Sequence, residues 1–238
     1  MDIAAIHALF TKCDSFTTDT RSIEKNMMYF ALKGENFDGN TFTKEALHKG
    51  AKYCIIDNPN FKINEQCVVV GNVLETLQKL ATYHRQQLNI PIIALTGSNG
   101  KTTTKELIDA VLSKQFKTTA TKGNLNNHIG VPLTLLSMTS QTEIGIVEMG
   151  ANHLKEIALL SEIAQPNYGL ITNFGKAHLE GFGSEEGVVQ GKSELYQFLI
   201  KNNQHIFVNN NDYKQVNLTN DYSNVIAYGN DCNLGDTS

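Results

Sequence analysis

A glycine-containing turn between a buried strand and a helix is the feature that most constrains the fold of this chain. Residues 90–95 form the apolar run Ile-Pro-Ile-Ile-Ala-Leu, which is typical of a buried strand. Residues 96–103 read Thr-Gly-Ser-Asn-Gly-Lys-Thr-Thr, and a helical pattern continues from Lys105. Because such a turn directs backbone N–H groups and a helix N-terminus at one point, a phosphate chain is its natural occupant.

The side chains of this turn predict how the phosphates would be held. We expect Lys101 to contact the outer phosphates and the Thr102 hydroxyl to hold a magnesium ion. The common pattern G-x-x-x-x-G-K-[ST] is not fully met, because Leu95 occupies the position of its first glycine. A chance G-K-T in a loop is the alternative, and the flanking strand and helix disfavour it. The residues expected to bind the nucleotide here are Gly97, Ser98, Asn99, Gly100, Lys101, Thr102 and Thr103.

Composition sets broad limits on partners and location. A chain of 238 residues can form one or two domains, and its formal charge of −4 gives no general reason to expect nucleic acid or a lipid surface as partner. The cysteines are scattered without a C-x-x-C pair, which favours reduced thiols in the cytoplasm. No apolar stretch approaches membrane-spanning length, and residues 1–6 lack the basic region of a secretion signal, so we expect a cytoplasmic protein.

The first part of the chain reads as a small α/β domain over residues 1–88. Apolar residues at helical spacing behind Asp2 predict a helix over 3–10 with Asp2 as its N-cap. Residues 33–39 contain two glycines and read as a loop. Strands are predicted over 28–32, 53–57 and 67–70, and further helices over 42–49 and 73–87.

The second part, residues 89–238, alternates strands and helices, which predicts a mostly parallel sheet covered on both faces. Ligands of such sheets gather at the carboxyl ends of the strands, where Glu148 and residues 173–178 fall together with the turn. The last thirty residues are polar and rich in asparagine, and the chain reads as cut within a domain. Further strands are predicted over 116–119, 144–148, 168–172 and 205–209, and helices over 102–113, 152–162 and 184–199.

These segments together resemble a known family, the ATP-dependent Mur ligases of bacterial cell-wall synthesis. The loop 96–103 is similar to the nucleotide signature of that family. The similarity runs from about Asp19 to about Asp212 in the family's order and spacing. Further segments resemble the members that add D-alanyl-D-alanine, and they are 19–21 with 30–39, 123–132, 148–151, and 173–180 with 182–184.

The resemblance implies a domain plan and a reaction. It implies an N-terminal α/β domain that holds the UDP end of the precursor, then a P-loop ATPase domain, with the chain truncated before a C-terminal domain. The implied substrates are ATP, UDP-N-acetylmuramoyl-tripeptide and D-alanyl-D-alanine, and the implied enzyme is a monomer. A substrate carboxylate attacks the γ-phosphate to become an acyl phosphate, which the amine of the dipeptide displaces. Both steps build charge on phosphoryl oxygens, so cations and N–H dipoles should dominate catalysis.

The candidate catalytic residues are Lys101, Glu148, His178 and Lys192, and the resemblance implies two magnesium ions. Lys101 is expected to clamp the β- and γ-phosphates, and Glu148 with Thr102 to hold the first magnesium. The alternative for Glu148 is a carboxylate that caps the helix after Gly150. By resemblance His178 helps to hold the second magnesium, although a lone loop histidine is more often a surface residue.

Lys192 is, by resemblance, a carbamylated lysine that supplies oxygen ligands to the second magnesium. A neutral amine can take up CO2, and burial makes a lysine neutral more readily by lowering its pKa. The alternative is an exposed helix lysine paired with Glu194 or Glu186.

Asparagine side chains are the candidate contacts for substrate and adenine. The amides of Asn124, Asn126 and Asn127 suit sugar and peptide recognition, although asparagine also favours turns. Asn209 and Asp212 resemble a segment near the adenine.

In the N-terminal domain, Thr20, Arg21 and Lys33 are the candidate contacts for UDP. The alternative is a local ion pair between Asp19 and Arg21 within a loop.

Three rival functions remain open at this point. A ligase that adds the third stem-peptide residue is a near rival, and residues 124–132 argue against it. Folylpolyglutamate synthesis is more remote, because a UDP-type domain precedes the ATPase domain. A nucleotide-binding module without ligase activity is the third.

Overall fold

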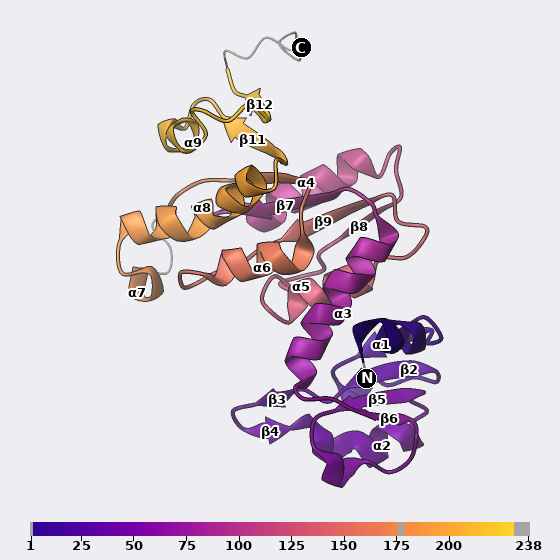
Figure 1. The fold of residues 1–238 in the computed structure, drawn as a ribbon. Coiled ribbons are helices and arrows are strands. Elements are labelled where there is room, and N and C mark those ends of the chain that lie inside the picture. The colour runs from indigo at the N-terminus through magenta and orange to yellow at the C-terminus, as the bar shows by residue number, and fades with distance from the viewer. Residues whose placement is uncertain (1, 176–178, 231–238) are drawn as a thin grey trace. The chain divides into compact units, whose positions relative to one another are not determined.

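The computed structural model describes residues 2–175 and 179–230. The chain divides between Gln87 and Leu88 into two compact units, one residue from the boundary expected at residue 88 (Figure 1). Each unit is built around its own parallel sheet. In the described ranges, none of the helices combines the length and apolarity needed to cross a membrane.

The first unit holds a four-stranded sheet in the order β1-β2-β5-β6, with every neighbouring pair parallel. The predicted cap of its first helix is confirmed, because the Asp2 side chain accepts from the Ala5 backbone N–H at 2.8 Å. The helix predicted over 73–87 is also present, and it packs its Leu77 and Leu80 side chains, both fully buried, into the core. The elements are α1 (Ile3–Phe10), β1 (Ser15–Thr17), β2 (Met27–Phe30), α2 (Thr43–His48), β5 (Tyr53–Ile56), β6 (Cys67–Val69) and α3 (Val73–Leu88).

Residues 33–39, predicted as a loop, instead form a two-stranded hairpin of β3 (Lys33–Gly34) and β4 (Phe37–Asp38). A β-carbon on Gly34 would lie 2.2 Å from the Phe37 ring, so a larger residue there would displace this exposed ring. The buried Asn40 side chain follows the hairpin and donates to the carboxylates of Asp38 and Asp57. The sequence gives no alternating pattern here because each strand is only two residues long.

The second unit holds a six-stranded sheet in the order β12-β11-β10-β7-β9-β8, and all of its pairs are parallel. The predicted strand–helix alternation is therefore confirmed. The strands are β7 (Ile92–Thr96), β8 (Thr118–Ala120), β9 (Ile144–Glu148), β10 (Tyr168–Ile171), β11 (His205–Asn209) and β12 (Val225–Tyr228). The helices are α4 (Lys101–Leu112), α5 (Gly130–Leu136), α6 (Glu156–Ala164), α7 (Leu179–Phe182), α8 (Glu185–Lys201) and α9 (Tyr213–Leu218).

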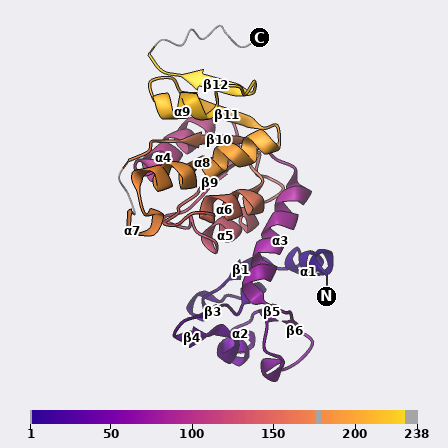
Figure 2. The ribbon, with the colours of Figure 1, turned by 60° about the vertical axis from the view of Figure 1, so that its left-hand side comes forward.

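Helices cover both faces of this sheet, as neighbouring residues of β10 show. Leu170 belongs to a core cluster with Ile108 of α4, whereas a β-carbon on Gly169 would meet Leu195 and Leu199 of α8. Successive strand residues point to opposite faces, so α4 and α8 lie on opposite sides of the sheet. Figure 2 shows α5 and α6 as neighbours within the same unit.

In the second unit, several segments differ from the sequence expectation, α7 among them, which was not predicted. The polar stretch after Asn209 holds α9 and β12, and β12 extends the sheet by pairing with β11. Helix α6 begins at Glu156 rather than near residue 152, because Lys155 has a left-handed φ of 72°. Helix α5 was not predicted because its sequence, Gly-Val-Pro-Leu-Thr-Leu-Leu, is apolar on most of its surface and carries no amphipathic period.

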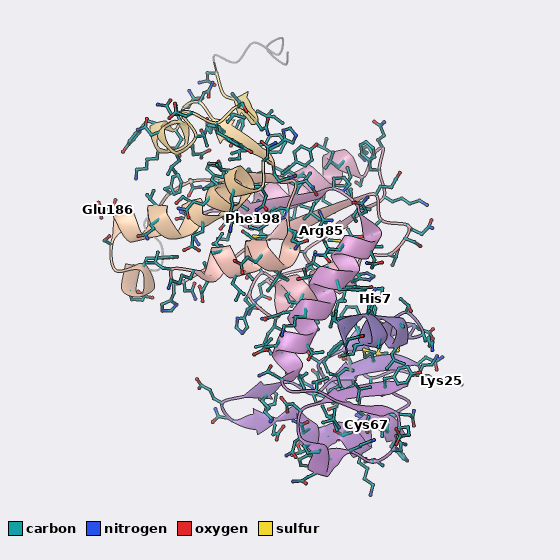
Figure 3. The ribbon with its side chains drawn as sticks, viewed as in Figure 1. His7, Lys25, Cys67, Arg85, Glu186 and Phe198 are labelled. Atoms are coloured by element: carbon teal, nitrogen blue, oxygen red, sulfur yellow. The ribbon has the colours of Figure 1, made fainter. Side chains whose placement is uncertain are left out.

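A pair of histidines in the first unit makes its stability depend on pH. Nε2 of His7, labelled in Figure 3, lies 3.0 Å from Nδ1 of His84, so one ring donates and the other accepts. Burial, and then the charge of His84, lower the pKa of His7. In the unfolded chain the pKa of His7 is about 6.5. Below that pH the unfolded chain binds a proton more readily than the native chain, so the free energy of unfolding decreases as the pH is lowered.

We therefore expect the urea midpoint of unfolding to fall between about pH 7.5 and about pH 5.5 by more in the wild-type chain than in a His7→Gln variant. The amide of glutamine keeps polar groups at this position but does not titrate. Equal decreases in the two proteins would contradict this account of the pair.

Candidate functional site

The turn between β7 and α4 depends on two glycines with positive φ. Gly97 has φ of 143°, and a β-carbon on it would lie 2.0 Å from Oγ1 of Thr172. Gly100 has φ of 77° and is the N-cap residue of α4. The first hydrogen bond of the helix runs from the Thr104 N–H to the Gly100 carbonyl. The N–H groups of residues 101–103 therefore lie at the open end of α4, as an anion site requires.

Ser98 and Asn99, predicted to bind nucleotide, connect the turn to the segment after β10. The Ser98 N–H donates to the Asn173 carbonyl at 3.0 Å, and its hydroxyl donates to the Gly175 carbonyl at 2.9 Å. The Asn99 carbonyl accepts from the Thr172 hydroxyl at 2.7 Å. These bonds hold the turn against the carboxyl end of a neighbouring strand, which fixes where the open N–H groups point.

Lys101, the first residue of α4, lies across the turn. Its Nζ donates to the carbonyls of Gly97 at 2.8 Å and Ser98 at 3.4 Å. Burial lowers the pKa of Lys101, while the nearby carboxylate of Glu148 raises it. The sequence prediction that Lys101 and Glu148 share one site is therefore consistent with the structure. Thr102 and Thr103 are exposed in the first turn of α4.

Glu148 ends β9, is 1% exposed, and has one satisfied carboxylate oxygen and one unsatisfied one. Its Oε1 accepts from the Asn126 side-chain amide at 2.8 Å, and its backbone N–H donates to the Thr121 hydroxyl at 3.0 Å. Its Oε2 is buried and has no hydrogen-bond partner among residues 2–175 and 179–230. A buried carboxylate oxygen without a hydrogen-bond partner lowers the free energy of unfolding, and a bound cation would offset this desolvation cost. The donor chemistry therefore fits magnesium, which prefers oxygen ligands.

The alternative interpretation of Glu148 as a helix cap is wrong. The start of α6 is capped by Glu194, which projects from α8. Oε1 of Glu194 accepts from the Lys155 N–H at 2.6 Å, and its Oε2 accepts from the Ala158 N–H at 2.9 Å. Glu148 is thus available for another role.

The predicted substrate asparagines divide into separate roles. Asn126 binds Glu148 through its side chain and accepts from the Gly150 N–H at 2.8 Å through its carbonyl. Oδ1 of Asn127 accepts from the Gly130 N–H at 2.8 Å at the start of α5, which is turn and cap chemistry. Asn124 is exposed. All three line the cavity described below, so their predicted contact with substrate stays a prediction.

Lys192 lies inside the fold, so the alternative of an exposed lysine is wrong. It is 1% exposed, its Nζ donates to the Ala151 carbonyl at 2.9 Å, and it lies 5.2 Å from the centre of the Phe182 ring. Burial, and then the charge of Lys101, lower the pKa of Lys192 to about 8. Glu186 is exposed in the first turn of α8 (Figure 3), and the carboxylate of Glu194 is used at the start of α6.

A cavity of about 390 Å³ joins these elements within the second unit. Its polar wall carries Lys101 and the asparagine segment, and its apolar wall comes from α6. Lys192 reaches its edge through the Ala151 carbonyl. The lining residues are Lys101, Asn124, Asn126, Asn127, His128, Gly150, Ala151, Asn152, Glu156, Leu159 and Leu160.

The remaining candidates lie elsewhere. Asn209 is the last residue of β11, and Asp212 follows the strand and caps α9 by accepting from the Lys214 N–H at 3.0 Å. Their predicted role near the adenine is not tested by these contacts. His178 lies outside the described residues. Within the described ranges, no group of three or more His, Cys, Asp or Glu side chains is placed to hold a metal.

In the first unit, the local ion pair named as the alternative is present. Arg21 is 88% exposed and its guanidinium lies 2.6 Å from the Asp19 carboxylate. Hydrogen bonds from Arg21 lower the pKa of Asp19 to about 2. Thr20 begins the same short 3-10 helix, and Lys33 pairs with Asp57 at 2.8 Å. Contact of these side chains with UDP stays a prediction.

Both units of the chain match models of known protein families. Residues 95–236 match the Mur ligase middle domain, and residues 13–96 match the catalytic domain model of the Mur ligase family. The chain belongs to the Mur ligase family. The range that matches the middle domain contains both the glycine turn and Glu148.

Individual relatives agree with this assignment. The chain is 42% identical over 193 residues to the UDP-N-acetylmuramoyl-tripeptide–D-alanyl-D-alanine ligase of Bacillus subtilis, covering 80% of this chain and 42% of that protein. MurF from Acinetobacter baumannii has a TM-score of 0.82 and 31% identity, covering 95% of this chain and 52% of its own. MurF ligase from Thermotoga maritima in complex with ADP has the same TM-score and identity, covering 94% and 52%. The chain therefore spans about half the length of these relatives.

The sequence analysis did not predict the supporting roles of Thr121 and Glu194, and it assigned Asn126 to substrate rather than to Glu148. Thr121 holds the backbone of Glu148, Asn126 holds its carboxylate, and Glu194 caps α6 from another helix. Each acts across a long sequence separation through one or two hydrogen bonds, so no local pattern marks it. The one available signal was the position of Thr121, two residues after the strand predicted over 116–119.

The two turn glycines should differ in their tolerance of alanine. In Gly100→Ala the added β-carbon meets no atom within 4 Å. The only expected cost is the left-handed backbone, which lowers the free energy of unfolding by about 1 kcal/mol. Gly97→Ala adds a collision with Thr172 to its backbone strain, so we expect about 3 kcal/mol. Urea unfolding of both variants measures these losses, and equal destabilisation would contradict the geometry of the turn.

Proposed function

We propose that this chain is the precursor-binding and ATP-binding part of a ligase that joins D-alanyl-D-alanine to UDP-N-acetylmuramoyl-tripeptide, forming ADP and phosphate. The names of the relatives support this substrate pair, and the ADP complex of the Thermotoga maritima structure supports the nucleotide. The observation that carries the proposal is the buried, unsatisfied Oε2 of Glu148 in the neighbourhood of Lys101.

In this proposal the residues of the second unit position the triphosphate and compensate its charge. The open N–H groups of α4 and the Lys101 ammonium bind the β- and γ-phosphates. Thr102 and Glu148 hold one magnesium ion, and His178 and Lys192 contribute to holding a second. Bound magnesium neutralises charge that develops on the phosphoryl oxygens. The substrate carboxylate then attacks the γ-phosphorus, ADP leaves, and the dipeptide amine displaces phosphate from the acyl phosphate.

The proposal includes carbamylation of Lys192. With a pKa of about 8, roughly a tenth of Lys192 is neutral at pH 7, and the neutral share grows as the pH is raised. The neutral amine attacks the carbon of CO2, a nitrogen–carbon bond forms, and one proton is released to water. The product carries two oxygens in place of an ammonium, which reverses the charge that Lys192 presents.

The choice of precursor tests the function and separates it from its nearest rival. We expect calorimetry to show that UDP-N-acetylmuramoyl-tripeptide binds this chain at least about tenfold more tightly than the corresponding dipeptide precursor. A ligase that adds the third residue would prefer the dipeptide form, and a simple nucleotide-binding module would bind neither.

The nucleotide half is tested with Lys101→Met, which should weaken MgATP binding by about tenfold or more because it removes a charge-assisted contact. Lys114→Met is the matched control, since Lys114 is exposed just beyond α4. Equal affinity of the Lys101 variant and the wild-type chain would contradict the assigned role of Lys101.

Carbamylation can be observed directly with isotopically labelled CO2. We expect a carbamate carbon signal in the carbon-13 NMR spectrum of the wild-type chain that grows as the pH is raised toward about 8 and is absent from Lys192→Gln. Lys201→Gln, which alters an exposed lysine of the same helix, should leave the signal unchanged. A signal that survives in Lys192→Gln would overturn the assignment.

A further inference from the structure

A second buried lysine lies on α4 and has no part in the reaction as proposed above. Lys105 is 1% exposed, and lysine is almost never buried so completely unless it is paired. Its Nζ donates to the backbone carbonyl of Thr121 at 2.6 Å and lies 2.7 Å from the carboxylate of Glu106. Glu106 is 64% exposed, so the buried end of this contact is the one with Thr121.

Thr121 connects Lys105 to Glu148. It directly follows β8, is 2% exposed, and its N–H donates to the Ile146 carbonyl at 2.9 Å. Its hydroxyl accepts from the Glu148 N–H at 3.0 Å. The ammonium of Lys105 and the backbone of Glu148 are therefore joined through the main chain and the side chain of one residue.

The segment that begins at Thr121 also controls the carboxylate of Glu148. Five residues later, Asn126 donates to Oε1 of Glu148, which directs Oε2 away from that amide. Both restraints on Glu148 thus come from one segment, and Lys105 holds that segment where it leaves the sheet. Loss of the Lys105 contact would leave a buried carbonyl without this donor and loosen both restraints together.

The position of Lys105 on its helix gives the contact a functional meaning. Residues four apart lie on the same face of a helix, so Lys105 is one turn beyond Lys101. One rigid helix therefore carries the phosphate-binding ammonium at its first residue and the anchor of the Glu148 segment one turn later. A shift of α4 would move both groups in concert.

We propose that Lys105 is a positioning residue that couples α4 to Glu148, so that a phosphate on the turn and a divalent cation on Oε2 are held in register. The inference rests on the proposed function, because it assumes that Glu148 is a ligand of the cation. It assigns to Lys105 no contact with substrate, nucleotide or metal.

The test compares Lys105→Met with Glu106→Gln in the chain of residues 1–238. Methionine fills the space without an ammonium, and Glu106→Gln removes the exposed partner while keeping the Thr121 contact. Calorimetry measures ADP affinity with Mn²⁺ and with chelator. We expect Lys105→Met to raise the Mn²⁺ concentration needed for half-saturation of the ADP complex by about tenfold, with metal-free ADP affinity unchanged. Glu106→Gln should change it less than about twofold.

Amide hydrogen exchange supplies a readout independent of the metal. The Glu148 N–H should exchange faster in Lys105→Met than in Glu106→Gln, because its acceptor on Thr121 is loosened. An equal loss of ADP affinity with and without metal would show that Lys105 supports the fold only and would overturn the inference. The inference would also be overturned if ADP binding to the wild-type chain depends on Mn²⁺ and Lys105→Met needs the same Mn²⁺ concentration for half-saturation.

A second variant covers the case in which Lys105→Met does not fold. Thr121→Val keeps the carbonyl that Lys105 binds but removes the hydroxyl that accepts from Glu148. A selective loss of Mn²⁺ affinity in this variant would support the coupling, and normal Mn²⁺ affinity would overturn it. If ADP binding to the wild-type chain is itself independent of metal, the proposed function fails, and the inference fails with it.

Discussion

The arrangement of the second unit depends on the burial of one carboxylate with one of its oxygens unsatisfied. Glu148 is enclosed at the end of β9, where Asn126 binds one oxygen and nothing in the described part of the chain binds the other. A fold selected for stability alone would supply a donor or replace the carboxylate, because the desolvation cost is not recovered. The cost is understandable if the oxygen serves a cation. The nearby Lys101, the open end of α4 and the cavity then belong to one site.

The parallel sheet is what brings these groups together. Its register places the end of β7 beside the end of β9 on one side and of β10 on the other. The glycine turn, Glu148 and the segment 172–175 therefore meet at one edge, although they are far apart in the sequence. Helix α8 contributes two side chains near this edge: Lys192 donates to the Ala151 carbonyl, and Glu194 caps α6. The segment between β9 and α6 is thus held at both ends by one helix.

The sequence predicted the repetitive part of this architecture well. Apolar runs such as 144–148 and 205–209 coincide with β9 and β11, because buried parallel strands are short and continuously apolar. The glycine turn was recognisable because its positive φ angles favour glycine at both Gly97 and Gly100. Short or irregular elements were not predicted: the hairpin after Lys33 is too short for a period, and α5 is too uniformly apolar. The motifs named the candidate site residues, whereas the hydrogen bonds that hold those residues were not predicted.

The limits of prediction follow from what a hydrogen bond requires. Whether Asn126 contacts substrate or Glu148 is decided by the position of a strand 22 residues away. Whether Lys192 is buried is decided by the packing of Phe182 over α8, which needs Gly191 because a β-carbon there would lie 2.4 Å from the ring. These contacts belong to the tertiary structure. A sequence motif indicates which residues lie at the site but not which of them contact one another.

A crystal structure of the chain with Mn²⁺ and a non-hydrolysable ATP analogue tests the central claim most directly. The account predicts an anomalous peak within about 2.2 Å of Oε2 of Glu148, with Oε1 still bound to Asn126. An ion bound to the analogue alone, with Oε2 of Glu148 remote from it, would contradict the account.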